Sequence, residues 1–248
     1  MILFEDVAKT YDNAEYAVRN LSFEVEEGEV VVLLGTSGSG KTTTMKMVNR
    51  LIEPSTGRIS IGGRDIMAGD PVELRLGIGY AIQQVGLFPH MTIGENIEIV
   101  PNLLGWDKER KQTRTREMLA LVKLDPDDFI NRYPGQLSGG QQQRVGVARA
   151  LAGDPQIILM DEPFGALDPL TRDELQKEFR NLQERLRKTV IFVTHDIFEA
   201  FELGDRVAIL DEGRMVQIGT PHELVHEPAS EFVARFVGSV REKISLFQ

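Results

Sequence analysis

The chain has 248 residues, of which 42% are hydrophobic and 27% charged, which suits one large domain or one domain with a sizeable insertion. Its formal net charge is −10, and a surface of that sign repels nucleic-acid phosphates and anionic lipid headgroups. A basic run at 108–116 is interleaved with acidic residues and predicts a solvated helix face, so we expect no nucleic-acid partner. The absence of cysteine excludes disulfides, thiolate zinc sites and cysteine nucleophiles, and it fits a reducing compartment.

The first residues predict a strand rather than a secretory leader, because they lack a basic segment and are acidic by Glu5. Together with the stretches 21–25 and 58–61, which glycines separate, they predict a small antiparallel sheet. The apolar run 30–34 is far shorter than the roughly 20 residues that span a bilayer. We therefore predict neither export nor a membrane span.

Strands and helices alternate through most of the remaining sequence. The later strands carry apolar residues on both faces, as strands do in a parallel sheet that helices cover on both sides. We therefore predict an α/β fold with a parallel core. The predicted strands are 30–34, 156–160, 189–193 and 207–210, and the predicted helices are 41–52, 139–152, 170–186 and 197–203.

Residues 91–151 break this alternation, since their pattern is helical throughout, with prolines and a glycine as punctuation. We interpret this segment as a helical insertion. The prediction is one domain over 1–248, with a core formed by 1–90 and 152–248 and an inserted helical subdomain at 91–151.

The residues after the first core strand fit the P-loop pattern GxxxxGK[ST], in the strand-to-helix context that this pattern requires. Glycines let successive backbone amides turn inward, and these amides and the helix dipole hold a phosphate. Lys41 would reach the β- and γ-phosphates, and the Thr42 hydroxyl would bind Mg²⁺. A Gly/Ser-rich turn that matches by chance is the alternative. The predicted nucleotide-binding residues here are Gly35, Thr36, Ser37, Gly38, Ser39, Gly40, Lys41, Thr42 and Thr43.

Two adjacent carboxylates follow the apolar strand predicted at 156–160. A P-loop protein needs one carboxylate there to organise Mg²⁺, and Asp161 fits that role. Glu162 lies at the mouth of the strand, where partial desolvation makes a carboxylate a better base toward water. The alternative is an acid pair that merely ends a strand.

The pentapeptide Leu137-Ser138-Gly139-Gly140-Gln141 precedes this acid pair. It is the signature sequence of ATP-binding cassette (ABC) ATPases, and the chain resembles that family from end to end. The resemblance implies ATP hydrolysis with ATP and Mg²⁺ as ligands. It also implies a P-loop NTPase fold with a RecA-like parallel sheet core, an antiparallel β subdomain and an inserted α-helical subdomain. A plain helix N-cap is the alternative interpretation of the pentapeptide.

Four further residues stand where the family has functional groups. The resemblance implies that Tyr11 stacks on adenine, and that Gln83 binds Mg²⁺ and relays the nucleotide state to the helical subdomain. It also implies that Asp168 communicates across a dimer and that His195 contacts the γ-phosphate and orients the attacking water. Gln84 is a neighbouring alternative to Gln83. Tyr11 could instead be an ordinary half-buried tyrosine, and His195 could be a structural histidine.

The resemblance also implies that two copies pair head to tail on binding ATP. Each nucleotide would lie between the P-loop of one copy and the signature pentapeptide of the other. Ser138 and Gly139 begin the helix predicted at 139–152, so their amides and the helix dipole can meet a γ-phosphate.

Residues 222–226 match HExxH, the zinc-binding pattern of metalloproteases. Against a zinc site, Thr220 and Glu223 form a capping box, and Pro221 occupies the first helical position. Pro228 ends the helix, and the sequence defines no third ligand. We therefore interpret this match as a capped helix.

The stretches 48–54 and 83–92 look like those of cassettes from bacterial uptake systems for quaternary-ammonium osmoprotectants such as glycine betaine, carnitine and choline. This resemblance implies the motor subunit of a membrane importer, peripheral at the cytoplasmic face, with a solute-binding protein in the same system. Many such cassettes continue into a C-terminal regulatory pair of domains, whereas this sequence stops at Gln248. Either that regulation is absent or the chain is trimmed.

Transmembrane permease subunits would dock on the segment from Val85 to His90, where Leu87 and Phe88 supply apolar surface.

The same motifs are compatible, in part, with other functions. An importer motor for a different small polar solute keeps every motif. A soluble ABC ATPase would be expected to carry a second cassette or a coiled-coil insertion, and a P-loop small-molecule kinase would leave the signature unexplained.

Overall fold

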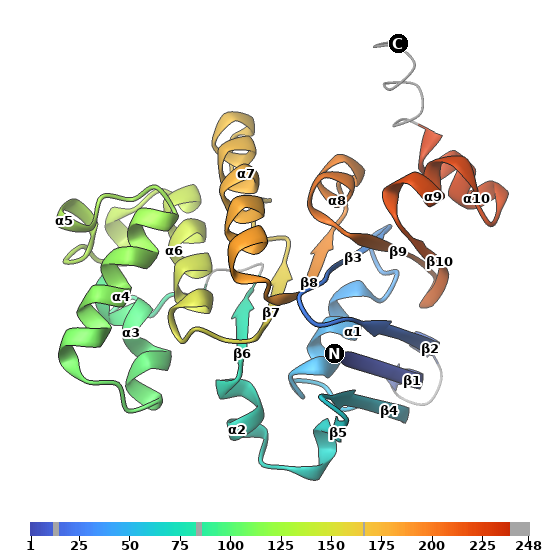
Figure 1. Ribbon diagram of the computed structural model, residues 1–248, viewed down its shortest axis with the longest axis horizontal. Coiled ribbons are helices and arrows are strands. Elements are labelled where there is room, and N and C mark those ends of the chain that lie inside the picture. Colours follow the sequence, from blue (N-terminus) through green and yellow to red (C-terminus); the bar gives the residue numbers. More distant parts are fainter. Residues whose placement is uncertain (12–14, 83–85, 166, 239–248) are drawn as a thin grey trace. The chain divides into compact units, whose positions relative to one another are not determined.

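The computed structural model describes residues 1–11, 15–82, 86–165 and 167–238. The chain divides into two compact units (Figure 1). The first unit comprises Met1–Pro71 and the C-terminal segment from Thr189, and the second is Val72–Lys188. The predicted α/β class is confirmed, and the predicted subdomain boundaries remain a prediction.

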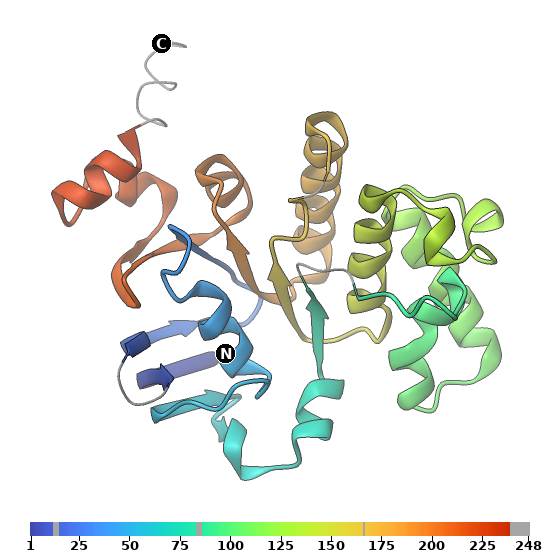
Figure 2. The ribbon, with the colours of Figure 1, turned by 180° about the vertical axis from the view of Figure 1, so that it is seen from behind.

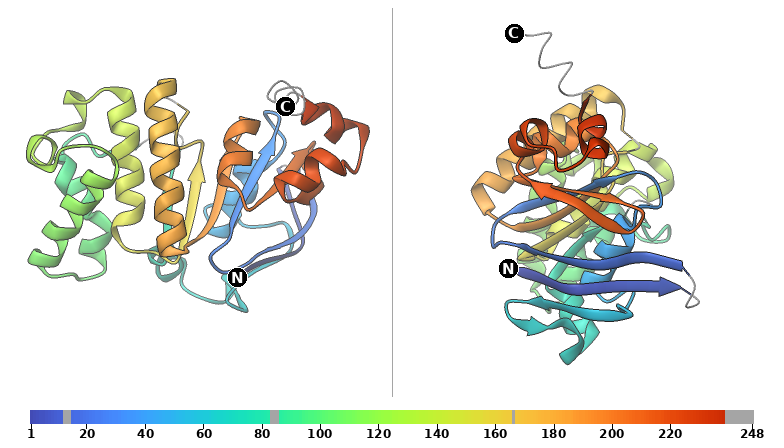
Figure 3. Two further views of the ribbon diagram at one scale, coloured as in Figure 1. Left: turned by 45° about the horizontal axis from the view of Figure 1, so that its top comes forward. Right: turned by 90° about the vertical axis from the view of Figure 1, so that its right-hand side faces the viewer.

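The first unit begins with an antiparallel sheet, as predicted from the opening residues and the stretches 21–25 and 58–61 (Figure 3). Alternate residues of its long strands are buried, and Phe4 and Phe23 stack with ring centroids 4.3 Å apart. The strand order is β2-β1-β4-β5, with β1 at Ile2–Tyr11, β2 at Glu15–Val25, β4 at Thr56–Ile61 and β5 at Arg64–Asp65.

The same unit contains four strands of a second sheet in the order β10-β9-β3-β8. Strand β3 runs parallel to both β8 and β9, and every residue of β3 and β8 is buried, so helices and loops cover both faces. The strands are β3 at Val30–Gly35, β8 at Thr189–Thr194, β9 at Arg206–Asp211 and β10 at Arg214–Gly219. The helices are α1 at Lys41–Val48, η1 at Ile66–Ala68, α8 at Ile197–Leu203, α9 at Pro221–His226 and α10 at Glu231–Phe236.

The second unit joins a parallel strand pair to a group of helices (Figure 2). Helices α3, α4 and α6 pack on one another, so the predicted helical character of this segment is confirmed. The strands are β6 at Ile78–Ala81 and β7 at Ile157–Asp161. The helices are α2 at Pro71–Leu76, which starts at the unit boundary, α3 at Ile93–Leu103, α4 at Lys108–Leu121, α5 at Pro126–Phe129, η2 at Pro134–Gln136, α6 at Gly139–Ala152 and α7 at Pro169–Leu186.

One predicted helix is shorter than expected. Helix α1 ends at Val48 rather than at residue 52, because Asn49 caps it and Arg50 adopts a left-handed φ of 52°. The guanidinium of Arg50 then donates to the carbonyl oxygens of Ile66 (3.2 Å) and Gly69 (2.8 Å), which holds the chain in this turn. Strands β6 and β10 and helix α2 were not predicted.

Candidate functional site

The P-loop connects β3 to α1 in the first unit. Gly40, the N-cap of α1, has a φ of 96°, and a Cβ there would lie 2.4 Å from the carbonyl oxygen of Ala17, so only glycine fits. This N-cap makes no side-chain hydrogen bond, whereas Thr92, Ser138 and Asp168 cap α3, α6 and α7 through their side chains. The first amides of α1 are therefore directed at the loop without a side-chain acceptor at the cap, as an anion site requires.

The Lys41 side chain is 7% exposed and folds into this loop. Its Nζ donates to the carbonyl oxygens of Gly35 (2.9 Å) and Thr36 (2.7 Å) and lies 3.4 Å from the Oγ of Ser39. A buried cation in a glycine-rich loop supplies the positive charge that a bound phosphate needs. Lys41 is therefore buried within the loop, and the assignment of this loop as a phosphate site stays a prediction.

The acid pair lies in the second unit, at the end of β7, whose residues are all buried. Asp161 is only 3% exposed. Burial, together with the nearby carboxylate of Asp161, raises the pKa of Tyr80 on the neighbouring strand β6, so that hydroxyl stays protonated. Glu162 follows with a left-handed φ of 47°, and its carbonyl oxygen accepts a hydrogen bond from Nε2 of Gln143 at 3.1 Å.

The signature pentapeptide forms the N-terminus of α6 in the same unit, where Ser138 and Gly139 are exposed and Leu137 is buried. The Oγ of Ser138 accepts from the amide of Gln141 (3.3 Å), and the Oε1 of Gln141 accepts from the amide of Ser138 (2.9 Å). This capping box accounts for two of the amides at the helix N-terminus, and those of Gly139 and Gly140 belong to the first turn, which has no intrahelical acceptors. A Cβ built on Gly139 would meet nothing within 4 Å, so the turn presents open backbone.

The remaining predicted residues fall in both units. Tyr11 is 48% exposed at the end of β1, and Nζ of Lys9 lies 5.4 Å from its ring centroid. His195 is exposed between β8 and α8. Asp168 caps α7 by accepting from the amide of Thr171 at 3.0 Å, and this hydrogen bond lowers the pKa of Asp168. The predicted residue Gln83, like Gln84, Val85 and Ala166, lies outside the described residues.

The HExxH match lies on α9, and its glutamate takes part in capping that helix. Glu223 and Thr220 make the predicted capping box, whose hydrogen bonds lower the pKa of Glu223. The rings of His222 and His226 stack at 4.1 Å, and Nδ1 of His226 lies 2.9 Å from the carbonyl oxygen of His222. Within the described ranges, no group of three His, Cys, Asp or Glu side chains is arranged to hold a metal ion.

An apolar pocket of about 320 Å³ lies in the second unit beside the predicted docking segment. Phe88 lines it and is 45% exposed, and Ile99 and Val100 of α3 are also among the lining residues. Asn96 is fully buried. Its Oδ1 accepts a hydrogen bond from the amide of Phe88 (2.8 Å), and its Nδ2 donates to the carbonyl oxygen of Phe88 (3.2 Å). Arg149 of α6 donates to the carbonyl oxygen of Gly86 (2.8 Å), and burial lowers the pKa of Arg149. The segment is therefore held from two helices.

Three residues near these sites were missed from the sequence: Tyr80, Asn96 and Gln143. Asn96 and Gln143 are at most 4% exposed on helices whose buried positions are otherwise mainly apolar. A polar residue at such a position is a sequence signal for a buried hydrogen bond. The hydrogen-bond partner of such a residue can be identified only in the folded structure.

A glycine-rich loop between a parallel strand and a helix without a side-chain N-cap, and a second strand that ends in a buried aspartate, define an α/β P-loop nucleotide-binding protein. The chain belongs to the ABC transporter family, whose model matches residues 18–165.

Three curated relatives are each more than 50% identical to this chain over the aligned residues. The glycine betaine/carnitine/choline transport ATP-binding protein OpuCA of Bacillus subtilis is 57% identical over 97% of this chain and 63% of its own length. The carnitine transport ATP-binding protein OpuCA of Listeria monocytogenes is 58% identical over 97% of this chain and 60% of its own length. The osmoprotectant import ATP-binding protein OsmV of Salmonella typhimurium is 54% identical over 97% and 64%, respectively. The chain thus spans less than two thirds of the length of these relatives.

Among solved structures, the ATP-binding cassette MJ0796 in a dimeric post-hydrolysis state bound to ADP and Pi superposes with a TM-score of 0.82. It is 37% identical in sequence and is matched over 89% of this chain and 98% of its own. The predicted P-loop NTPase fold of the ABC type is confirmed. No helix in the described part of the chain is both long and apolar enough to cross a membrane.

Proposed function

We propose that this chain is the ATP-hydrolysing motor subunit of a membrane ABC importer for quaternary-ammonium osmoprotectants such as glycine betaine, carnitine or choline. The observation that carries the proposal is the near-complete alignment of the chain with relatives named as transport ATP-binding proteins for these solutes. The subunit would act at the cytoplasmic face of the membrane, as a peripheral partner of permease subunits and a solute-binding protein.

The P-loop fits ATP, because it combines amides without a side-chain cap with the buried ammonium of Lys41. Tyr11 is exposed enough to stack on adenine, a contact worth about 1 to 3 kcal/mol for a base on an aromatic ring. Asp161, with Thr42 and Gln83, would hold Mg²⁺, which would neutralise part of the charge of the phosphates. Oxygen ligands of this kind are the ones that Mg²⁺ prefers.

Hydrolysis would follow from the acid pair and the histidine. Glu162 would accept the proton of the attacking water, and His195 would contact the γ-phosphate and fix the position of that water. Asp168 would carry information between two copies of the chain. Dimerisation on ATP is supported by the dimeric state of the similar cassette and by the open, exposed turn at Gly139.

Permease docking on the pocket beside Phe88 gives a first prediction. Phe88→Glu should abolish most stimulation of ATP hydrolysis by the permease while leaving the basal rate of the isolated chain near parental, because a charge would be buried in an apolar contact. The measurement is ATPase activity with and without permease in proteoliposomes. Leu103→Glu, at a 67% exposed apolar position of α3 outside the pocket lining, is the matched control. Full stimulation of the Phe88 variant would place docking elsewhere.

The transport proposal itself is tested by reconstitution with the permease and binding protein of the same system. Glycine betaine, carnitine or choline supplied with the binding protein should raise ATP hydrolysis and be imported. Stimulation by a different polar solute alone would support the alternative importer. ATP hydrolysis that no membrane partner affects would support a non-transport ABC ATPase.

A further inference from the structure

The backbone at Glu162 adopts a conformation that its sequence disfavours. Its φ of 47° is in the left-handed region, although the residue carries a side chain. The next residue is Pro163, and a residue before proline is normally driven toward extended conformations. Strained backbone of this kind persists only where its surroundings hold it in place.

Two hydrogen bonds hold the peptide group that follows this φ. The carbonyl oxygen of Glu162 accepts from Nε2 of Gln143 at 3.1 Å and from the amide of Gly165 at 3.1 Å. Gln143 projects from α6 and is only 4% exposed, so water competes little for its amide. The bond from Gln143 is the one that comes from outside the turn.

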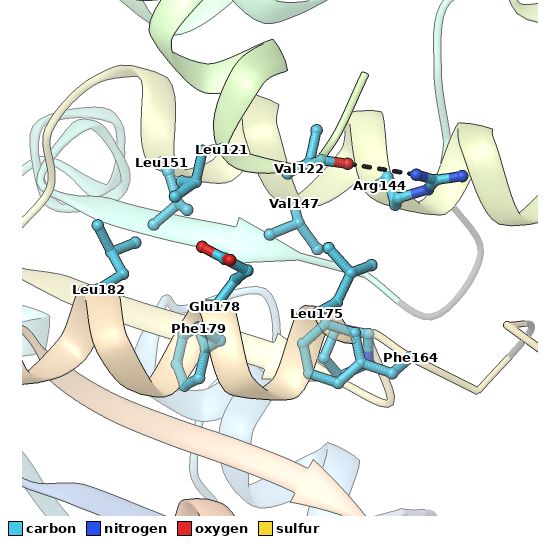
Figure 4. Close-up of a pocket in the computed structure, with 11 residues that line it drawn as sticks. Leu121, Val122, Arg144, Val147, Leu151, Phe164, Leu175, Glu178, Phe179 and Leu182 are labelled. Carbon is cyan, nitrogen blue, oxygen red and sulfur yellow. Dashed lines mark hydrogen bonds between the residues drawn. The ribbon is translucent and has the colours of Figure 1, made fainter. Parts of the chain in front are cut away.

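Apolar packing fixes the same turn in place without fixing the direction of its carbonyl. Phe164 is 3% exposed and lines a small cavity of about 20 Å³ between α6 and α7, with Val147, Leu175 and Phe179 (Figure 4). Such contacts are non-directional, whereas a hydrogen bond restricts the orientation of the peptide plane. Phe164 therefore anchors the turn, and Gln143 sets the rotation of the peptide group at Glu162.

We propose that Gln143 is a positioning residue for ATP hydrolysis: its side-chain amide holds the Glu162 carbonyl and so keeps the Glu162 carboxylate aimed at the attacking water. This inference rests on the proposed function, in which Glu162 is the base. Without the hydrogen bond, Glu162 can relax toward the extended conformation that precedes proline, and its carboxylate moves away from the water. A displacement of about 1 Å is enough to slow an enzymatic step by as much as 10²-fold.

The test compares Gln143→Met, which keeps the side-chain length and removes the donor, with the parental chain. The kcat for ATP hydrolysis should fall about 10- to 10²-fold, while KM and the Kd for ATP stay within about twofold. Gln183→Met is the matched control, since Nε2 of Gln183 donates to the carbonyl oxygen of Lys188 at the end of α7. That variant should keep a parental kcat.

A double-mutant cycle separates positioning from a general structural role. In a Glu162→Gln background, Gln143→Met should change the single-turnover hydrolysis rate by less than about twofold, because the residue acts through Glu162. An equal fold loss in both backgrounds, or a parental kcat for Gln143→Met, would overturn the proposal. If Gln143→Met does not fold, Gln143→Leu replaces it and should lose as much kcat, since its side chain has no donor for the carbonyl. A parental chain without ATPase activity would instead reject the proposed function.

Discussion

Glu162→Gln should slow ATP hydrolysis at least about 10²-fold and leave the Kd for ATP near its parental value. The amide has the size of the carboxylate but cannot take a proton from water. The backbone of Glu162 should be unaffected, because its carbonyl oxygen still accepts from Gln143 and Gly165. Single-turnover phosphate release and equilibrium binding of ATP measure the two quantities.

The matched control for this change is Glu184→Gln on α7. Glu184 is 69% exposed and lies 3.8 Å from Arg180, so its loss removes only a surface ion pair. Its hydrolysis rate should stay within about twofold of the parental rate. A Glu162→Gln chain that hydrolyses ATP as fast as this control would remove Glu162 from the role of base.

Lys41→Ala should weaken ATP binding about 10- to 10²-fold and reduce hydrolysis by about 10² to 10³. The Lys41 ammonium is the cation that the structure places inside the P-loop, with two backbone carbonyls of the loop as acceptors. Removing it leaves the phosphates without their fixed counter-charge. Isothermal titration with ATP and steady-state hydrolysis measure the two effects.

Lys46→Ala, in the last turn of the same helix, separates this effect from a general loss of charge on α1. Because Lys46 is five residues beyond Lys41, ATP affinity should be unchanged. A thermal-unfolding comparison of the two variants checks that the loop still folds. Parental ATP affinity in a folded Lys41→Ala chain would show that the nucleotide is bound elsewhere.

Local sequence signals were sufficient for several elements of the fold. Helix α6 begins where predicted, because the Ser138–Gln141 capping box is encoded within four residues, and it ends where predicted, before Gly153. Strands β6 and β10 were missed, since Ile78–Ala81 is short and contains Gly79 and the burial of β10 is mostly intermediate. Such strands are specified by their neighbours rather than by their own pattern.

The candidate site likewise contains some features that could be predicted from the sequence and others that could not. The P-loop and the acid pair are contiguous and could be predicted from residue types and spacing, whereas the signature pentapeptide was predicted from the resemblance to ABC ATPases. The left-handed φ of Glu162 and its bond to Gln143 join residues 19 positions apart, so no local pattern encodes them. The end of α1 was mispredicted for a similar reason, because Arg50 is held by the distant carbonyls of Ile66 and Gly69.

The arrangement of two chains around ATP is tested most directly by a crystal structure of the Glu162→Gln chain grown with ATP and Mg²⁺. We expect a dimer in which each triphosphate lies on the P-loop of one copy, with Lys41 at its β- and γ-phosphates. Ser138 and Gly139 of the other copy should contact the γ-phosphate. A structure in which ATP is bound while both Ser138 turns face solvent in every assembly would contradict this account.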